Sequence, residues 1–160
     1  MNVFDYFFEN TKNLDKDFVI GNKETISYKN LYQNSLRIAS YLNENIGVDN
    51  HVILISQNSV FFITAYLGIL KSGNICVPLD FTIEQENLDF ISKITESKMI
   101  FSDERSLSRL NYKNFREVID EDKFDETLEY HNVFSLDKIF DSQNLAEIIF
   151  TSGSTGKPKG

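Results

Sequence analysis

The sequence has no tryptophan, one cysteine, two prolines and fewer basic than acidic residues. Cys76 has no second cysteine to pair with, and the first residues lack a basic segment followed by an apolar run, so we expect a cytoplasmic protein without an internal disulfide. Sixteen Lys and Arg against 24 Asp and Glu give a net charge of −8. That sign opposes a sequence-independent grip on a phosphate backbone, so nucleic acid is not an expected partner.

Long hydrophobic runs and clustered metal ligands are also missing. The longest nearly uncharged stretch, residues 56–70, carries several polar side chains and stops at Lys71, so it predicts a buried helix rather than a membrane span. His51 and His131 lie far apart, and neither has a cysteine or second histidine at a ligand spacing. We therefore predict no transmembrane segment and no metal site in these residues.

What the sequence does contain is the material of a folded core. Hydrophobic residues make up 41% of its 160 residues, and 14 Phe and 7 Tyr supply large aromatic side chains. A chain of this length buries roughly 70% of the surface that it exposes when unfolded. We expect a compact globular unit rather than a disordered one.

Apolar runs alternate with helical periodicities along most of the chain. The patterns predict helices at 3–10, 28–46, 59–72 and 83–97, and strands at 18–20, 25–28, 52–55, 75–79, 99–101 and 145–150. Asn58 or Ser59 is suited to begin the third helix, and Gly73 to end it. Because continuous apolar strands need cover on both faces, we predict an α/β fold of alternating βαβ units, with a mainly parallel sheet covered by helices.

Residues 103–144 give a weaker signal. The apolar content of residues 115–119 is compatible with a short strand, and an acidic cluster follows between residues 120 and 129. The cluster does not match a calcium loop, because no glycine stands at the sharp turn and the oxygen ligands do not alternate as required. We expect residues 103–144 to be a solvated connection.

The last ten residues, TSGSTGKPKG, differ from the rest in composition. They hold small and hydroxyl-bearing residues and two lysines, contain no acid, and follow directly on the predicted strand at 145–150. Small residues let backbone N–H groups approach an anion, hydroxyls add donors and lysines neutralise charge, which together favour a phosphate-binding loop at 151–160. A Walker A loop is excluded because Pro158 follows Lys157, and a dinucleotide fingerprint is excluded by the glycine spacing.

This segment resembles the phosphate-binding signature of the adenylate-forming enzymes, the superfamily of acyl-CoA synthetases, luciferases and nonribosomal adenylation domains. Two earlier segments agree in order and spacing, ISYKNLYQNS at Ile26–Ser35 and LKSGNICVPLD at Leu70–Asp80. The resemblance extends over residues 1–160, but only over the first part of the family's large N-terminal domain. It implies that the rest of that domain, a small C-terminal domain and the catalytic residues are absent from these 160 residues.

The resemblance implies a site and a reaction. Its nucleotide-binding residues would be Thr151, Ser152, Gly153, Ser154, Thr155, Gly156, Lys157 and Lys159, which would hold the β- and γ-phosphates of ATP. Of the two lysines, Lys159 is expected to contribute more than Lys157. Magnesium would accompany ATP, with ligands beyond Gly160.

The implied activity is activation of a carboxylic acid to an acyl-adenylate, followed by transfer to the thiol of coenzyme A or of a carrier-protein phosphopantetheine. The identity of the acid, the choice between these acceptors and the oligomeric state stay open. The 160 residues alone are expected to be inactive. The alternative function is a non-catalytic module that binds a nucleotide or phosphate or a protein partner.

Overall fold

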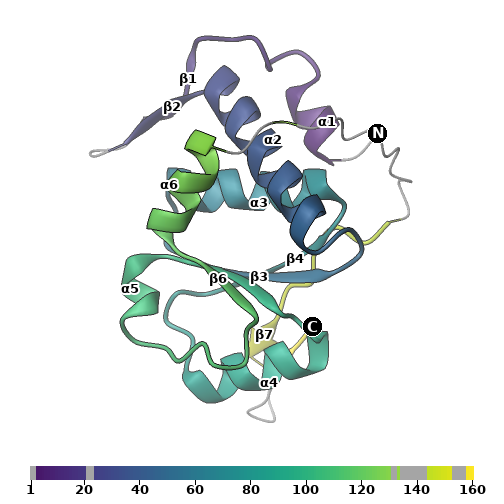
Figure 1. Cartoon of the computed structure of the whole chain (residues 1–160), viewed down its shortest axis with the longest axis vertical. Coiled ribbons are helices and arrows are strands. Elements are labelled where there is room, and N and C mark those ends of the chain that lie inside the picture. The colour runs from purple at the N-terminus through teal and green to yellow at the C-terminus, as the bar shows by residue number, and fades with distance from the viewer. Residues whose placement is uncertain (1–2, 21–23, 131–132, 134–143, 153–157) are drawn as a thin grey trace.

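The computed structural model describes residues 3–20, 24–130, 133, 144–152 and 158–160. In chain order its elements are α1 (Val3–Phe8), β1 (Asp17–Ile20), β2 (Thr25–Ser27), α2 (Tyr28–Asn45), β3 (His51–Ile55), α3 (Val60–Ser72), β4 (Ile75–Leu79), α4 (Gln85–Thr95), β5 (Met99–Ser102), α5 (Glu104–Leu107), β6 (Glu117–Ile119), α6 (Glu121–Tyr130), β7 (Thr151–Ser152) and β8 (Pro158–Lys159). Figure 1 shows α2, α3 and α6 on one face of the central sheet, and α4 and β7 on the other.

The central sheet has four parallel strands in the order β4-β3-β5-β6. Val52 of β3 is aligned with Cys76 of β4 on one side and with Met99 of β5 on the other. Met99 is in turn aligned with Glu117 of β6. The prediction of an α/β fold with a parallel sheet between helices is confirmed.

Successive residues of the central strands face two separate cores. In β3, Val52 and Leu54 belong to the core under α2, α3 and α6, whereas Ile53 and Ile55 belong to the core over α4. All four side chains are fully buried. A continuous apolar run therefore marks a strand covered on both faces, as the sequence predicts.

An aromatic cluster joins the N-terminus to the two long helices. Phe4 and Phe8 of α1 are almost completely buried, and both rings contact Tyr32 of α2, at centroid distances of 5.6 and 5.1 Å. The antiparallel pair β1 and β2 lies beside this cluster, where Phe18 packs edge-on against Phe7. The predicted helix at 3–10 and the two strands after it are thus confirmed, with the helix ending at Phe8.

Local signals set the ends of α3. The Ser59 side chain accepts a hydrogen bond from the Phe62 N–H at 3.0 Å, so Ser59 rather than Asn58 is the N-cap. Gly73 ends the helix in the left-handed conformation at φ 77°, which glycine adopts without strain. Among the described residues, no helix combines the length and apolar character needed to cross a membrane.

The expectation of a solvated connection over residues 103–144 is wrong for its described part. Residues Glu121–Tyr130 form α6, and Asp120 begins this helix by accepting the Lys123 N–H at 2.9 Å. Phe124 is buried against Phe61, with ring centroids 4.7 Å apart, and Thr127 on the same face is also buried. Acidic residues in the first turn favour the helix because they interact with its dipole, so the charge that suggested a loop helps to form α6.

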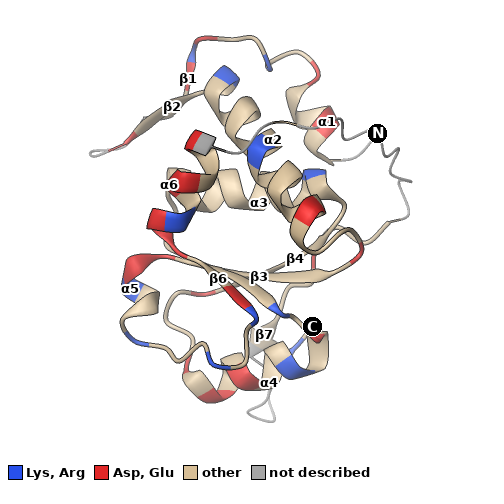
Figure 2. Cartoon of the chain, viewed as in Figure 1, with Lys and Arg blue, Asp and Glu red and all other residues tan. Residues whose placement is uncertain are grey.

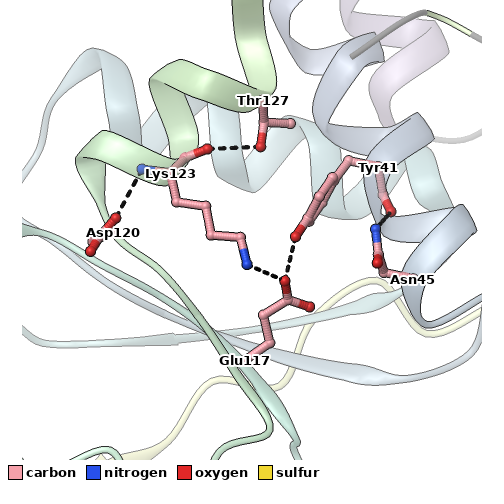
Figure 3. Close-up of polar contacts among 6 residues, drawn as sticks. All are labelled: Tyr41, Asn45, Glu117, Asp120, Lys123 and Thr127. Carbon is pink, nitrogen blue, oxygen red and sulfur yellow. Dashed lines mark hydrogen bonds and ion pairs between the residues drawn. The ribbon is translucent and has the colours of Figure 1, made fainter. Parts of the chain in front are cut away.

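A polar network joins α6 to the rest of the fold. Both the Tyr41 hydroxyl and the Lys123 ammonium donate to the same oxygen, Oε1 of Glu117 (Figure 3). The three residues come from α2, α6 and β6. The Glu117 carboxylate thus fixes α2 and α6 relative to β6, one of the two edge strands of the sheet.

The predicted strand at 145–150 is also wrong as stated. Only an isolated parallel bridge forms there, with the Cys76 N–H donating to the Ala146 carbonyl at 3.0 Å and the Ile148 N–H to the Cys76 carbonyl at 2.9 Å. The next donor along this edge of β4 would be residue 78, which is a proline inside the strand. Because proline has no N–H, the ladder cannot continue, and the segment is attached to β4 without becoming a full strand.

Candidate functional site

The ends of the predicted phosphate loop are brought together by a short antiparallel pair. Thr151 is aligned with Lys159 and Ser152 with Pro158, and the Thr151 hydroxyl donates to the Lys159 carbonyl at 3.4 Å. The side chains of Thr151 and Lys159 are exposed. The other predicted site residues, Gly153, Ser154, Thr155, Gly156 and Lys157, lie outside the described residues.

The segment that leads into this pair lies at the outer edge of β4 and runs parallel to it. Ile148 and Phe150 pack against the core over α4. A Cβ at Gly160 would lie 2.9 Å from both of these side chains. Glycine therefore lets the chain leaving the loop pass directly over the segment that enters it.

A charged side chain occupies the middle of this entry segment. The Tyr66 hydroxyl of α3 donates to Oε2 of Glu147 at 3.0 Å, and Glu147 also lies beside the buried Cys76. Burial, and to a smaller degree the charge of Glu147, raises the pKa of the Cys76 thiol. Cys76 is thus a protonated, buried thiol that packs as a small hydrophobic residue.

The carboxyl ends of the parallel strands, where α/β proteins commonly bind ligands, are organised by Asp103. This residue follows β5 and accepts the backbone N–H of Gln57, after β3, at 2.9 Å and that of Ser106 at 2.8 Å. Burial opposes ionisation of Asp103, but these hydrogen bonds outweigh it and lower its pKa. The carboxylate is therefore a fixed anion that holds two loops together.

Acidic side chains gather near Asp103, at the carboxyl ends of the strands and on the β6 side of the sheet. Figure 2 shows acidic residues along α6 and beside α5. Burial, together with the charges of Asp103, Glu104, Asp125 and Asp122, raises the pKa of Glu121. Lys159 lies on the opposite side of the sheet, in the chain that follows the segment attached to the outer edge of β4.

A hollow of about 540 Å³ lies at the amino ends of the parallel strands, opposite the ends that Asp103 organises. Its lining includes His51, Met99 and Glu117, the first residues of β3, β5 and β6. The predicted phosphate loop follows the carboxyl end of its segment, so this hollow is not part of the candidate site. Among the described residues no group of three or more His, Cys, Asp or Glu side chains could hold a metal ion.

The sequence interpretation missed Tyr66, Asp103 and Glu147. A signal for Glu147 was present, because a carboxylate inside an apolar run requires a polar partner when the run is buried. A signal for Asp103 was its position directly after an apolar strand and before a helix, where aspartate caps well. Nothing in the sequence pattern paired Tyr66 with Glu147, since they lie 81 residues apart.

A family model described as AMP-binding enzyme matches residues 7–160. Bacitracin synthase 3 from Bacillus licheniformis is 31% identical over 147 residues, which are 91% of this chain and 2% of that protein. The D-alanine–D-alanyl carrier protein ligase from Listeria monocytogenes serotype 4b (strain F2365) is 31% identical over 139 residues, 84% of this chain and 27% of that protein. The chain therefore spans only a small part of these curated relatives.

The solved structures agree in fold. The crystal structure of ATP bound MatB from Rhodopseudomonas palustris matches with a TM-score of 0.80 at 21% identity, over 100% of this chain and 34% of that one. At this identity the likeness establishes the fold alone. The described part of the chain thus has an architecture found within a larger protein.

Proposed function

The chain belongs to the AMP-binding enzyme family, and on that premise we propose that it forms the opening part of a longer ligase that activates a carboxylic acid with ATP. The acid's carboxylate oxygen attacks the α-phosphorus of ATP, and the bond from that phosphorus to the oxygen bridging to the β-phosphate breaks. The products are an acyl-adenylate and pyrophosphate. A thiol of coenzyme A or of a carrier protein then attacks the acyl carbon, AMP leaves with the bonding electrons, and the thiol proton passes to solvent or a base.

The observation that carries this proposal is the pairing of Thr151 with Lys159. It closes both ends of a loop rich in glycine and hydroxyl side chains next to the carboxyl end of a segment parallel to β4. Loops of this composition supply backbone N–H donors to phosphate oxygens, and lysine adds a compensating positive charge. We assign Thr151 through Gly156, with Lys157 and Lys159, to the β- and γ-phosphates of ATP.

Magnesium would neutralise part of the charge on ATP in this reaction. The described residues offer it no cluster of ligands, so none of them is assigned to the metal. We place its ligands in chain that follows Gly160. We assign to the loop at 151–160 the binding and orientation of the phosphate chain, which are the main protein contributions to a phosphoryl or nucleotidyl transfer.

The test begins with the intact mass of the natural gene product, captured from its source cells. We expect a mass several times the 18.5 kDa of these residues. The purified natural protein is then assayed for ATP-pyrophosphate exchange with a panel of acids that includes amino acids such as D-alanine, fatty acids and anthranilate. Product capture with coenzyme A and with a carrier protein, in parallel, identifies the thiol acceptor.

Exchange that depends on one class of acid supports the proposal, and the same assay on residues 1–160 alone should give none. The proposal would be overturned if the natural protein had a mass of 18.5 kDa and showed no ATP-pyrophosphate exchange with any acid of the panel. Such a result would favour a non-catalytic module that binds a nucleotide or a protein partner.

A further inference from the structure

The segment that leads into the candidate phosphate loop has few backbone attachments. Two hydrogen bonds join it to β4, both at Cys76, and Pro78 removes the next possible donor. On its α4 face, Ile148 and Phe150 provide apolar contacts, which hold a segment in place but have little directional preference. On this segment Leu145 and Ile149 are 56% and 60% exposed.

Between these two exposed residues, the Glu147 side chain makes the directional contact with α3. The Tyr66 hydroxyl that donates to it sits on a ring held by the core, parallel to Phe62 at 7° and 6.3 Å between centroids. Burial, then the hydrogen bond to Glu147 and its charge, raises the pKa of Tyr66. The hydroxyl therefore keeps its proton at neutral pH and remains a donor.

We propose that Tyr66 and Glu147 are a positioning pair that fixes the entry segment, and with it the phosphate loop, relative to the central sheet. The argument rests on the proposed function, because positioning matters here for the binding of ATP. Neither side chain is expected to touch ATP. Their hydrogen bond acts through the three residues 148–150, which connect Glu147 to β7.

The first test uses the full-length natural protein and ATP-pyrophosphate exchange. Tyr66→Phe keeps the ring and removes only the hydroxyl, so we expect the KM for ATP to rise about threefold to tenfold, the effect of losing one hydrogen bond of ordinary strength. The KM for the acid should stay unchanged. Glu147→Gln retains an acceptor oxygen and should keep a KM for ATP close to that of the parent. Glu147→Leu removes the acceptor and should raise the KM for ATP as Tyr66→Phe does.

The matched control is Tyr41→Phe. It also removes a hydroxyl that donates to a glutamate, but its partner Glu117 lies at the start of β6, at the opposite edge of the sheet. This variant should leave the KM for ATP unchanged. An unchanged KM in Tyr66→Phe, or equal effects in Tyr66→Phe and Tyr41→Phe, would overturn the proposal.

A second measurement separates this proposal from the proposed function. Hydrogen exchange of the peptide spanning 145–152, followed by mass spectrometry, should be faster in Tyr66→Phe than in the parent protein and unchanged in Tyr41→Phe. If the parent protein activates no acid, the proposed function fails, and this measurement still decides whether the pair holds the segment. Equal exchange rates in Tyr66→Phe and the parent would refute the positioning role whatever the activity.

Discussion

Gly68 of α3 lies directly against Ile38 of α2, so that a Cβ built on the glycine would come within 2.6 Å of Ile38 Cγ2 and 2.7 Å of its Cβ. Ile38 is fully buried, and its Cβ cannot move away without moving the backbone of α2. The two helices that cover one face of the sheet therefore cross at a point where only glycine fits. This close contact with α2 fixes the position of α3, and therefore of Tyr66, relative to the sheet.

Gly68→Ala should destabilise the protein by about 1–2 kcal/mol, because overpacking of about 1–3 kcal/mol exceeds the helix propensity gained by alanine, which is at most about 1 kcal/mol. Urea unfolding of the variant should show a lower midpoint. Gln33→Ala, at an exposed position of α2, is the matched control and should leave the midpoint nearly unchanged. A urea midpoint at or above that of the parent would contradict this expectation, because α2 and α3 would then move apart to accept the added methyl group without a loss of stability.

Ser35 gives the opposite expectation at the same helix contact. Its buried hydroxyl has no hydrogen-bond partner among the described residues, and its backbone carbonyl lies 3.2 Å from the position of a Cβ on Gly68. Ser35→Ala removes a desolvated polar group and improves helix propensity, so it should be neutral or stabilising by up to about 1 kcal/mol. Thermal unfolding measures this difference, and a large loss of stability would mean that the hydroxyl has a partner in solution.

The Glu117 network predicts a pH dependence. Burial opposes ionisation of Glu117, but hydrogen bonds from Lys123 and Tyr41 outweigh it and lower its pKa in the folded state. A lowered pKa stabilises the fold above the unfolded-state pKa, near 4.3, and this contribution is lost as the pH falls through the folded-state pKa. Glu117→Gln should therefore be less stable than the parent at pH 7, by about 1 kcal/mol, with the difference shrinking below about pH 4.

Urea unfolding at several pH values tests this expectation. Glu126→Gln is the control, because Glu126 is an exposed carboxylate of α6, the helix that carries Lys123, and its difference from the parent should stay small at every pH. If the penalty of Glu117→Gln persisted undiminished at pH 3, the stabilisation would come from packing rather than from the ionised carboxylate.

The central sheet could be predicted from the sequence because its signals are local. Apolar runs at residues 52–55, 75–79 and 99–101 are bounded by polar or glycine-containing segments, and each strand appears within one residue of its predicted ends. Helix α6 was missed for a physical reason. Its acidic composition outweighed the spacing of Phe124, Thr127 and Leu128, which lie on one face and pack toward the sheet.

The candidate site could be located from the sequence only as a segment. Composition identified residues 151–160, and the structure adds the pairing of Thr151 with Lys159, while the roles of Gly153 through Lys157 stay predictions. The entry segment was assigned as a strand because its residues are apolar. What limits its pairing is a proline in a neighbouring strand, and what anchors it is a tyrosine on a distant helix, and neither relationship can be obtained from a local pattern.

The two lysines of the loop allow one more prediction about ATP. Lys159 contributes its backbone carbonyl to the contact with Thr151, whereas its side chain is exposed. Lys159→Met therefore leaves the pairing of β7 with β8 intact and removes only the charge. In the full-length protein we expect ATP-pyrophosphate exchange to fall about tenfold to a hundredfold, because a charge-assisted contact to the phosphates is lost.

Lys157→Met is the comparison, and it should reduce exchange less. Lys159→Arg keeps the positive charge and should recover part of the activity, although a guanidinium does not reproduce the point charge of an ammonium group. Thermal unfolding of all three variants should match the parent, since neither the pairing nor the core is altered. Exchange that is insensitive to Lys159→Met, or more sensitive to Lys157→Met, would reassign the phosphate contact to Lys157 or to the backbone of the loop.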